Sequence, residues 1–260
     1  MGHWSKDIGA EPCSEEHWPR ERIHAVLSQS YWFGTLSAAL QRSIVNRGEI
    51  RHFRARRPVY KVGDRVDGMY AALAGDFRSY VTGDDGDRML MRLVGPGAWF
   101  GAFQLIESVP ARNFEIRTAS PCTAMLLPRA GYDAILAEDP KNYLEFVKLT
   151  SFHLRTMIRI MVETRSTAER RTARAVLRIA RMHGRALGAG VEITIKLNQS
   201  DLASIVGVSR QYMNELLSRW NADGLLVWNG KGRSVLHVEK IRDLLTPLDD
   251  WLSEPAEGWA

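Results

Sequence analysis

The pattern of hydrophobic and polar positions changes its period along the chain, and the changes predict three structured regions. Between residues 32 and 47, apolar residues recur every three or four positions, as they do on one face of a helix. From residue 63 to residue 127, short apolar or alternating runs are separated by glycines, which is typical of strands joined by tight turns. After residue 140 the helical period returns. Residues 1–30 carry little pattern and are expected to form an N-terminal arm, or a short helix around residues 21–29.

The glycine-rich region predicts a compact antiparallel β-roll of the double-stranded β-helix or jelly-roll type, in a domain over residues 31–140. Eight glycines lie between residues 63 and 101, and Gly83–Asp87 and Gly95–Gly97 have the composition of turns. The runs expected to be strands are residues 69–73, 77–81, 89–94, 114–118 and 123–127. With the helices on either side, the chain is predicted to be of the α+β class.

Residues 141–166 are predicted to form one long helix with two apolar stripes. The first stripe has the four-three spacing of a coiled-coil seam and consists of Tyr143, Val147, Thr150, Leu154, Met157, Met161 and Thr164. The second consists of Phe146, Leu149, His153, Thr156 and Ile160. A single wide face in the core of a monomer is one interpretation. Two stripes favour a helix that packs on its own domain with one and on a second copy of the chain with the other, which predicts a homodimer.

Residues 167–260 are predicted to be a winged helix-turn-helix domain. Asn198 and Asp201 have the spacing of a helix cap, Gly207 suits a tight turn between helices, and Ser209 caps a second helix. The inward residues of that second helix are expected to be Tyr212 or Met213, with Leu216 and Leu217. Two strand-like runs follow, over residues 224–228 and 234–238, around a glycine-rich tip. An all-α helical hairpin with solvated polar residues is the alternative, and the predicted wing argues against it.

The polar residues of the second helix suit double-stranded DNA. A helix that enters the major groove places its first turn against base edges. There the Arg210 guanidinium suits guanine, the Gln211 amide suits adenine, and the Glu215 carboxylate suits the amino group of cytosine. Asn214 is included in this surface. The residues expected to contact phosphates are Ser200 and Ser209 at helix starts and Lys231 and Arg233 at the tip of the wing.

Composition narrows the possible functions without choosing among them. The chain has 260 residues, 45% of them hydrophobic and 25% charged, with a formal net charge of +5, which permits nucleic acid as a partner. Much of the excess lies between residues 165 and 185, where seven arginines accompany one glutamate in a predicted amphipathic basic helix that ends at Gly188-Ala189-Gly190. Two cysteines are too few for an iron–sulfur cluster or a Cys-only zinc site. No apolar run approaches the ~18 residues of a membrane span, and no signature of an enzyme occurs. We expect a cytoplasmic, non-enzymatic protein without a metal.

In this arrangement the chain resembles the CRP/FNR family of transcription regulators, over roughly residues 30–245. Two segments carry the resemblance: Ile205–Arg210, at the family's turn and recognition-helix start, and Gly95–Gly101 with Ala111-Arg112 downstream, at its phosphate-binding cassette. The resemblance implies a homodimer on a palindromic DNA site, control by an effector bound to the β-roll, and RNA polymerase as a partner. A sensor module that acts through protein contacts rather than DNA is the alternative.

The resemblance also implies where an effector would bind, with departures from the pattern. Gly101 and Arg112 match the residues that hold a cyclic phosphate, but Ala102 stands where cyclic-AMP binders carry a ribose-binding Glu. Asn113 replaces the usual Ser or Thr, and Thr156-Met157 replaces an adenine-contacting Thr-Ser pair. With Phe103 of the cassette, these residues are the expected site of a small anionic or nucleotide effector. Two alternatives are that Arg112 is a salt-bridge partner, and that His52 or His153 is an axial ligand of haem.

Overall fold

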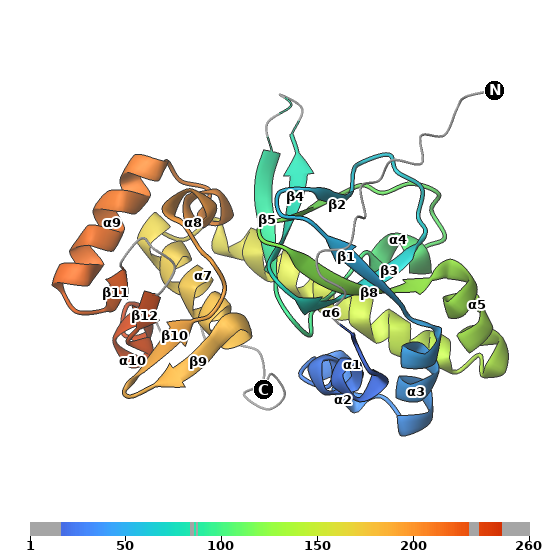
Figure 1. Ribbon diagram of the computed structural model, residues 1–260. Coiled ribbons are helices and arrows are strands. Elements are labelled where there is room, and N and C mark those ends of the chain that lie inside the picture. The colour runs from blue at the N-terminus through green and yellow to red at the C-terminus, as the bar shows by residue number, and fades with distance from the viewer. Residues whose placement is uncertain (1–16, 84–85, 87, 229–233, 246–260) are drawn as a thin grey trace. The chain divides into compact units, whose positions relative to one another are not determined.

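The computed structural model describes residues 17–83, 86, 88–228 and 234–245, and these form two compact units (Figure 1). The first unit consists of residues 17–81 and 94–151, and the second of residues 82–93 and 152–245. The chain passes from the first unit to the second and back over residues 82–93, in the hairpin that joins β4 (Phe77–Thr82) to β5 (Arg88–Val94). It passes to the second unit again in the middle of the long helix α6 (Asn142–Glu163).

Two four-stranded antiparallel sheets confirm the predicted β-roll. The first has the order β1-β8-β3-β6, with bounds Glu49–Phe53, Cys122–Pro128, Gly68–Ala74 and Trp99–Phe100. The second has the order β2-β7-β4-β5, with bounds Pro58–Tyr60, Glu115–Thr118, Phe77–Thr82 and Arg88–Val94. The five predicted strands correspond to β3, β4, β5, β7 and β8. The short strands β1, β2 and β6 were not predicted, because each has too few alternating positions to show a period of two.

The central strands of the first sheet, β3 and β8, are buried on both faces, which explains why they consist almost entirely of apolar residues. Successive side chains of a strand point to opposite faces. Tyr70 and Ala72 accordingly belong to the core between the two sheets, with aromatic residues such as Phe77 and Phe100. Their neighbours on β3 belong to a second core on the outer face, with Trp99 and the apolar residues of the surrounding helices. The cassette turn between β5 and β6 is thereby fixed between two cores.

Helices cover the outer face of the first sheet, and one predicted helix is divided into two. Their bounds are α1 Arg20–Leu27, α2 Tyr31–Thr35, α3 Ala38–Arg47, α4 Ala102–Ile106 and α5 Arg129–Glu138. The helix α1 confirms the short helix expected around residues 21–29 as the alternative to an arm, and Trp18, Ile23 and Leu27 are buried in the outer core. The single helix expected over residues 32–47 is interrupted, because the Ser37 side chain accepts a hydrogen bond from the backbone N–H of Leu40 and so starts a new helix.

The long helix α6 uses one side for its own unit and leaves another side exposed. The indole of Trp32 donates a hydrogen bond to the carbonyl of Glu145, and Phe146 and Leu149 are buried in the outer core. The large apolar side chains that remain exposed on this helix are Tyr143, Leu144, Leu154, Ile158, Met161 and Val162. This stripe is rotated from the predicted one, since Ile158 is 47% exposed whereas Met157 turns toward a pocket of the second unit.

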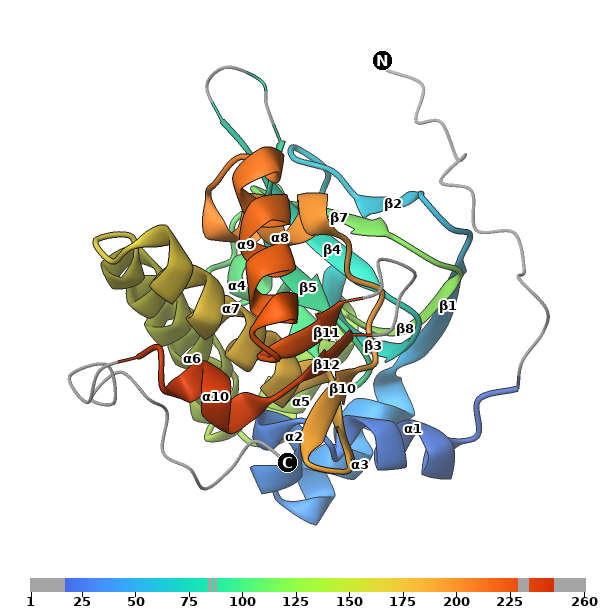
Figure 2. The same cartoon turned by 90° about the vertical axis from the view of Figure 1, so that its left-hand side faces the viewer.

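The second unit consists of helices and a four-stranded sheet. In Figure 2, α9 and the strands β11 and β12 lie toward the viewer. Its helices are α7 Ala168–His183, α8 Gln199–Val206, α9 Arg210–Ala222 and α10 Val238–Arg242. The sheet has the order β11-β12-β10-β9, with bounds Leu226–Trp228, Ser234–Leu236, Gly190–Ile193 and Gly184–Leu187. The strands β11 and β12 pair as the predicted wing.

The end of α7 differs from the prediction. We expected Gly188-Ala189-Gly190 to end the basic helix, but α7 ends at His183, and Gly188 lies in the turn of the hairpin β9–β10. Gly184 permits this change of direction, because a Cβ there would lie 2.0 Å from the carbonyl oxygen of Ala180. The hairpin adds two strands to the sheet of the wing.

Candidate functional site

The helix-turn-helix consists of α8 and α9, and local hydrogen bonds fix both of its helix starts. The Asn198 side chain accepts from the backbone N–H of Asp201 at 2.8 Å, and the Asp201 carboxylate accepts from the backbone N–H of Asn198 in return. Gly207 ends α8 with φ 73° and ψ 49°, a left-handed conformation that glycine adopts readily. Ser209 then caps α9 by accepting from the backbone N–H of Tyr212 at 3.1 Å. All four residues have the local roles that the sequence predicts.

The exposed side of α9 carries the residues predicted to read bases. Arg210, Gln211, Asn214 and Glu215 are all exposed, and we call these four residues the recognition face. On the opposite side of the helix the buried residues are Met213, Leu216, Leu217 and Trp220, so Met213 rather than Tyr212 is the inward residue. The recognition face is therefore displayed at the start of a helix whose other side is anchored in its domain.

Two hydrogen bonds hold amide side chains of this surface in place. The Gln211 amide donates to the Glu215 carboxylate at 3.1 Å, and the Gln199 amide donates to the Asn214 side-chain oxygen at 2.9 Å. Gln199 was not predicted, because its role depends on a contact between the two helices. Ser200 and Ser209 are exposed at the starts of α8 and α9, as the prediction of phosphate contacts requires. Lys231 and Arg233, predicted at the wing tip, lie outside the described residues.

The helix α7 forms side-chain hydrogen bonds with both helices of the helix-turn-helix. The Arg171 guanidinium donates to the carbonyl of Val206 at 3.2 Å, at the end of α8, and to the carbonyl of Ser166 at 2.8 Å. The Glu169 carboxylate accepts from the Trp220 indole and from the Arg219 guanidinium, both at 2.9 Å. The Trp220 hydrogen bond, with that of Arg219, lowers the pKa of Glu169. These contacts tie both helices to α7.

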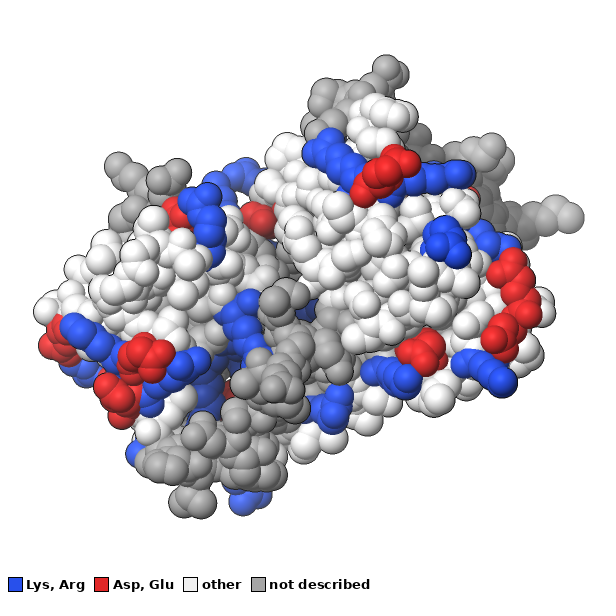
Figure 3. All heavy atoms as spheres, turned by 90° about the horizontal axis from the view of Figure 1, so that it is seen from below, with Lys and Arg blue, Asp and Glu red and all other residues white. Residues whose placement is uncertain are grey.

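Acidic side chains and carbonyls balance part of the positive charge between residues 165 and 185. Besides Arg171, Arg178 pairs with Glu163 at 3.2 Å and Arg185 pairs with Glu192 at 2.6 Å, and both glutamates are buried. The charge count from the sequence missed these two carboxylates because both lie outside residues 165–185. On the face drawn in Figure 3, basic and acidic atoms accordingly lie next to each other in several places.

Arg112, the predicted phosphate ligand, is buried in the first unit. Its guanidinium is fully buried and donates to the Asp67 carboxylate at 2.6 Å and to the carbonyls of Gly68 and Gly101 at 2.6 and 2.9 Å. It also lies over the ring of Tyr60, 4.2 Å from the centroid. The alternative of a salt-bridge partner therefore describes Arg112 as the structure has it, with only its Nε atom left without a hydrogen bond.

The rest of the cassette is arranged around this arginine. Gly101 has φ 74°, and a Cβ at this position would lie 2.7 Å from an Arg112 nitrogen. Ala102 is buried, so it offers neither a carboxylate nor space for one. Asn113 and Phe103 are exposed, and the Asn113 side chain accepts a hydrogen bond from the buried Gln104. Arg112 thus connects two parts of the cassette, because its guanidinium donates to the carbonyl of Gly101.

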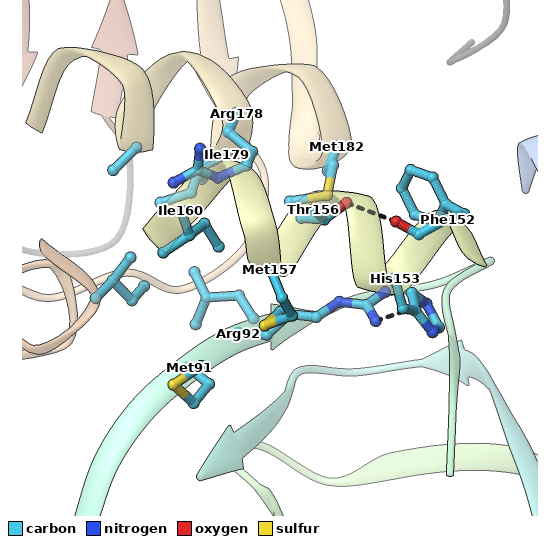
Figure 4. Close-up of a pocket in the computed structure, with 13 residues that line it drawn as sticks. Met91, Arg92, Phe152, His153, Thr156, Met157, Ile160, Arg178, Ile179 and Met182 are labelled. Carbon is cyan, nitrogen blue, oxygen red and sulfur yellow. Dashed lines mark hydrogen bonds between the residues drawn. The ribbon is translucent and has the colours of Figure 1, made fainter. Parts of the chain in front are cut away.

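Thr156 and Met157, predicted to contact the effector, lie in the second unit and line a pocket there (Figure 4). The pocket is partly open to solvent, and its walls come from β5, α6, α7 and α8. The Thr156 hydroxyl donates to the carbonyl of Phe152 at 3.1 Å. The five other predicted effector residues, Gly101, Ala102, Phe103, Arg112 and Asn113, belong to the first unit.

Both histidines considered as haem ligands have hydrogen-bond partners within the protein. His52 Nδ1 hydrogen-bonds with the Thr123 hydroxyl at 3.1 Å, and His153 Nε2 accepts from Arg92 at 3.1 Å. Within the described part of the chain, no three His, Cys, Asp or Glu side chains are grouped to hold a metal ion. Burial raises the pKa of the Cys122 thiol to about 11. No helix among the described residues is long and apolar enough to span a membrane.

The chain consists of a β-roll with a cassette turn, a long helix and a winged helix-turn-helix. This combination defines a class of regulators with a sensor domain and a DNA-binding domain. Residues 50–139 match the family model of the cyclic nucleotide-binding domain, and residues 170–244 match that of the Crp-like helix-turn-helix domain. The chain belongs to the CRP/FNR family of transcription regulators.

Similar proteins agree with this assignment. The CRP-like cAMP-activated global transcriptional regulator of Mycobacterium tuberculosis is 23% identical over 184 residues, which cover 70% of this chain and 82% of that protein. The fumarate and nitrate reduction regulatory protein of Escherichia coli is 22% identical and covers 66% of this chain and 69% of its own. The structure of FixK2 from Bradyrhizobium japonicum has a TM-score of 0.68 at 21% identity and covers 76% of this chain and 98% of its own.

Proposed function

We propose that this regulator binds DNA as a homodimer, with α9 of each copy in the major groove of one half of a palindromic site. The observation that supports this most directly is the recognition face, whose four polar side chains are exposed at the start of a helix anchored on its other side. The exposed apolar stripe of α6 supports the two-fold arrangement. Six large apolar side chains on one helix are an unusual surface unless a second copy covers them.

Within this proposal, the residues have separate tasks. Arg210, Gln211 and Glu215 read base edges, with Asn214 beside them, and Ser200 and Ser209 contact phosphates. Lys231 and Arg233 extend the phosphate contacts at the tip of the wing. The function is binding rather than catalysis, the expected place of action is the cytoplasm, and RNA polymerase is the expected protein partner at the promoter.

We do not expect cyclic AMP to be the effector. Arg112 is already paired with Asp67 and two carbonyls, and Ala102 provides no acceptor for a ribose hydroxyl. The loss of one charge-assisted hydrogen bond costs about 1.5–3 kcal/mol, or roughly ten- to a hundredfold in affinity.

The test compares two arginines of α9 that differ in position. Arg210→Ala removes a base-reading group from the first turn, whereas Arg219→Ala removes an exposed arginine from the last turn, where it pairs with Glu169. Dissociation constants are measured by fluorescence anisotropy on an operator, on single-base variants of it and on random DNA. We expect Arg210→Ala to lose about 1–3 kcal/mol on the operator and to become indifferent to one base position.

Arg219→Ala is expected to keep the base preference of the unchanged protein. If Arg210→Ala keeps that preference as well, the recognition face does not read bases. If the unchanged protein shows no DNA affinity at any salt concentration, it is a sensor module that acts through protein contacts.

A further inference from the structure

The recognition face receives a hydrogen bond from a residue outside it. The side-chain amide of Gln199, the first residue of α8, donates to the Oδ1 atom of Asn214 on α9 at 2.9 Å. The two residues are 15 positions apart, and their helices pack against each other as the two helices of the helix-turn-helix (Figure 2). Gln199 is therefore placed to influence base reading through Asn214.

Both side chains extend from a backbone that is fixed by other contacts. Gln199 directly follows Asn198, which forms the capping box of α8 together with Asp201. Asn214 directly follows Met213, which is fully buried. The hydrogen bond between these two anchored residues fixes the plane of the Asn214 amide. Since the oxygen and the nitrogen of an amide point in different directions from the same carbon, an oxygen directed at α8 turns the nitrogen away from α8.

This orientation decides which atom of Asn214 is available to a base. The Oδ1 atom already accepts from Gln199, whereas the Nδ2 atom takes part in no hydrogen bond within the described part of the chain. An unconstrained asparagine contacts adenine with both atoms, because its oxygen accepts from N6 and its nitrogen donates to N7. Asn214 instead offers mainly a donor. Guanine, with acceptors at both O6 and N7, matches a donor better than adenine does.

We propose that Gln199 is a positioning residue that sets the base preference of Asn214, so that Asn214 selects guanine rather than adenine. Opposite adenine, the N6 amino group would compete with Gln199 for the same oxygen. An amino group left without an acceptor lowers the affinity in a contact from which water is excluded. The inference rests on the proposed function, because it names a base that the same recognition face reads.

The other hydrogen bond of the recognition face leaves acceptors available instead of a donor. Gln211 donates an amide N–H to the Glu215 carboxylate at 3.1 Å, which leaves the Gln211 oxygen and the second carboxylate oxygen for the bases. The face therefore presents donors at Arg210 and Asn214 and acceptors at Gln211 and Glu215. Guanine is expected opposite the donors, and adenine or cytosine opposite the acceptors.

The test changes residue 199 between donor and acceptor. Gln199→Lys keeps a donor, Gln199→Glu has only acceptors, and Gln199→Ala has neither. Dissociation constants are measured by fluorescence anisotropy on the operator and on its single-base variants. Asn214→Ala identifies the base position that Asn214 reads, as the position whose preference is lost. The readout is the ratio of the dissociation constants for adenine and guanine at that position, because the uniform effect of a charge near the phosphates cancels in a ratio.

The unchanged protein and Gln199→Lys are expected to bind guanine at least about fivefold more tightly than adenine at this position. In Gln199→Ala the freed oxygen should remove this preference. Gln199→Glu should reverse it, because the carboxylate accepts from the Asn214 nitrogen and turns the Asn214 oxygen toward the base. Ser218→Ala, at an exposed position of α9 outside the recognition face, is the matched control and should keep the ratio of the unchanged protein.

A second measurement tests the hydrogen bond without DNA. In the ¹⁵N-labelled full chain, Asn214→Ala should shift the side-chain amide signal of Gln199, whereas Ser218→Ala should leave that signal in place. The backbone signals in the same spectra show that each variant is folded, so that a changed base preference is not the result of unfolding.

Three results would overturn the inference. The first is a guanine preference that stays the same in all three Gln199 variants while every DNA sequence is weakened equally, which would mean that Gln199 contacts a phosphate. The second is an Asn214→Ala variant that changes the preference at no position, and the third is an unchanged Gln199 amide signal in that variant. Arg210→Ala tests the proposed function separately. A base preference lost in Arg210→Ala but unaffected by residue 199 overturns only the inference, and the absence of DNA binding overturns both.

Discussion

Replacing Arg112 distinguishes a structural arginine from a ligand-binding one. In the structure its guanidinium donates to the carbonyls of Gly68 and Gly101 and to the Asp67 carboxylate, and its side chain is fully buried. In Arg112→Ala, two carbonyl groups lose their donor, and each such loss costs about 1–3 kcal/mol. Asp67 adds little, because its side chain is 49% exposed and water can solvate the carboxylate. With the cavity and the lost contact with Tyr60, we expect a destabilisation of about 3–5 kcal/mol.

That loss is a large part of the total stability of an ordinary domain, about 5–15 kcal/mol. The assay is urea denaturation of the full chain without any ligand, followed by the fluorescence of the tryptophans packed in the first unit. Arg51→Ala is the matched control, because Arg51 forms an ion pair with Glu49 in which both side chains are about half exposed. Such pairs contribute about 0–1 kcal/mol.

A ligand-binding Arg112 predicts the opposite pattern. A buried cation without an anion destabilises the ligand-free protein. The removal of a ligand-binding Arg112 would therefore leave the free energy of unfolding unchanged or increase it. If Arg112→Ala unfolds within 1 kcal/mol of Arg51→Ala, the structural role described here is wrong. Adding cyclic AMP to the unchanged protein should not raise its stability, whereas a cyclic phosphate at Arg112 would raise it with concentration.

Two further predictions concern the second unit. Burial, with the nearby Arg92, lowers the pKa of His183 to about 4 from 6.5, so the unfolded chain binds a proton that the folded chain does not bind between these values. The free energy of unfolding should therefore fall as the pH drops through this window, by about 2 kcal/mol at pH 5. His183→Phe should flatten the pH dependence of urea denaturation. An unchanged pH dependence would mean that His183 is not buried as a neutral group. Gly207→Ala should cost about 1–2 kcal/mol because of the positive φ, and Gly207→Asn less, measured in the same way; equal costs would contradict a left-handed turn.

The sequence predicted the parts of the fold that local rules determine. The caps of α8 and α9, the turn at Gly207 and the exposed recognition face depend on residues a few positions apart, and each was found where expected. The continuous apolar runs of strands β3 and β8 were visible because each strand has seven residues. Short strands such as β1 and β9 carry too little pattern, and the break before α3 depends on one serine.

What sequence reasoning missed depends on long-range pairs. Asp67, 45 positions before Arg112, gives that arginine its structural role, and no spacing rule connects the two. In the same way, Glu163 and Glu192 pair with Arg178 and Arg185, which look free in the sequence. The rotation of the α6 stripe, with Ile158 exposed and Met157 in the pocket, depends on packing that the heptad pattern does not specify.

The central claim is that this chain reads a palindromic DNA site through the recognition face of α9. Selection of bound fragments from a random pool of double-stranded DNA, with the full-length protein at physiological salt, tests it most directly. We predict enrichment of a palindrome whose two half-sites are about 10 base pairs apart, centre to centre, and loss of one base preference per half-site in Arg210→Ala. A pool that remains random after several rounds, or one enriched in sequences that Arg210→Ala recovers unchanged, would contradict the account.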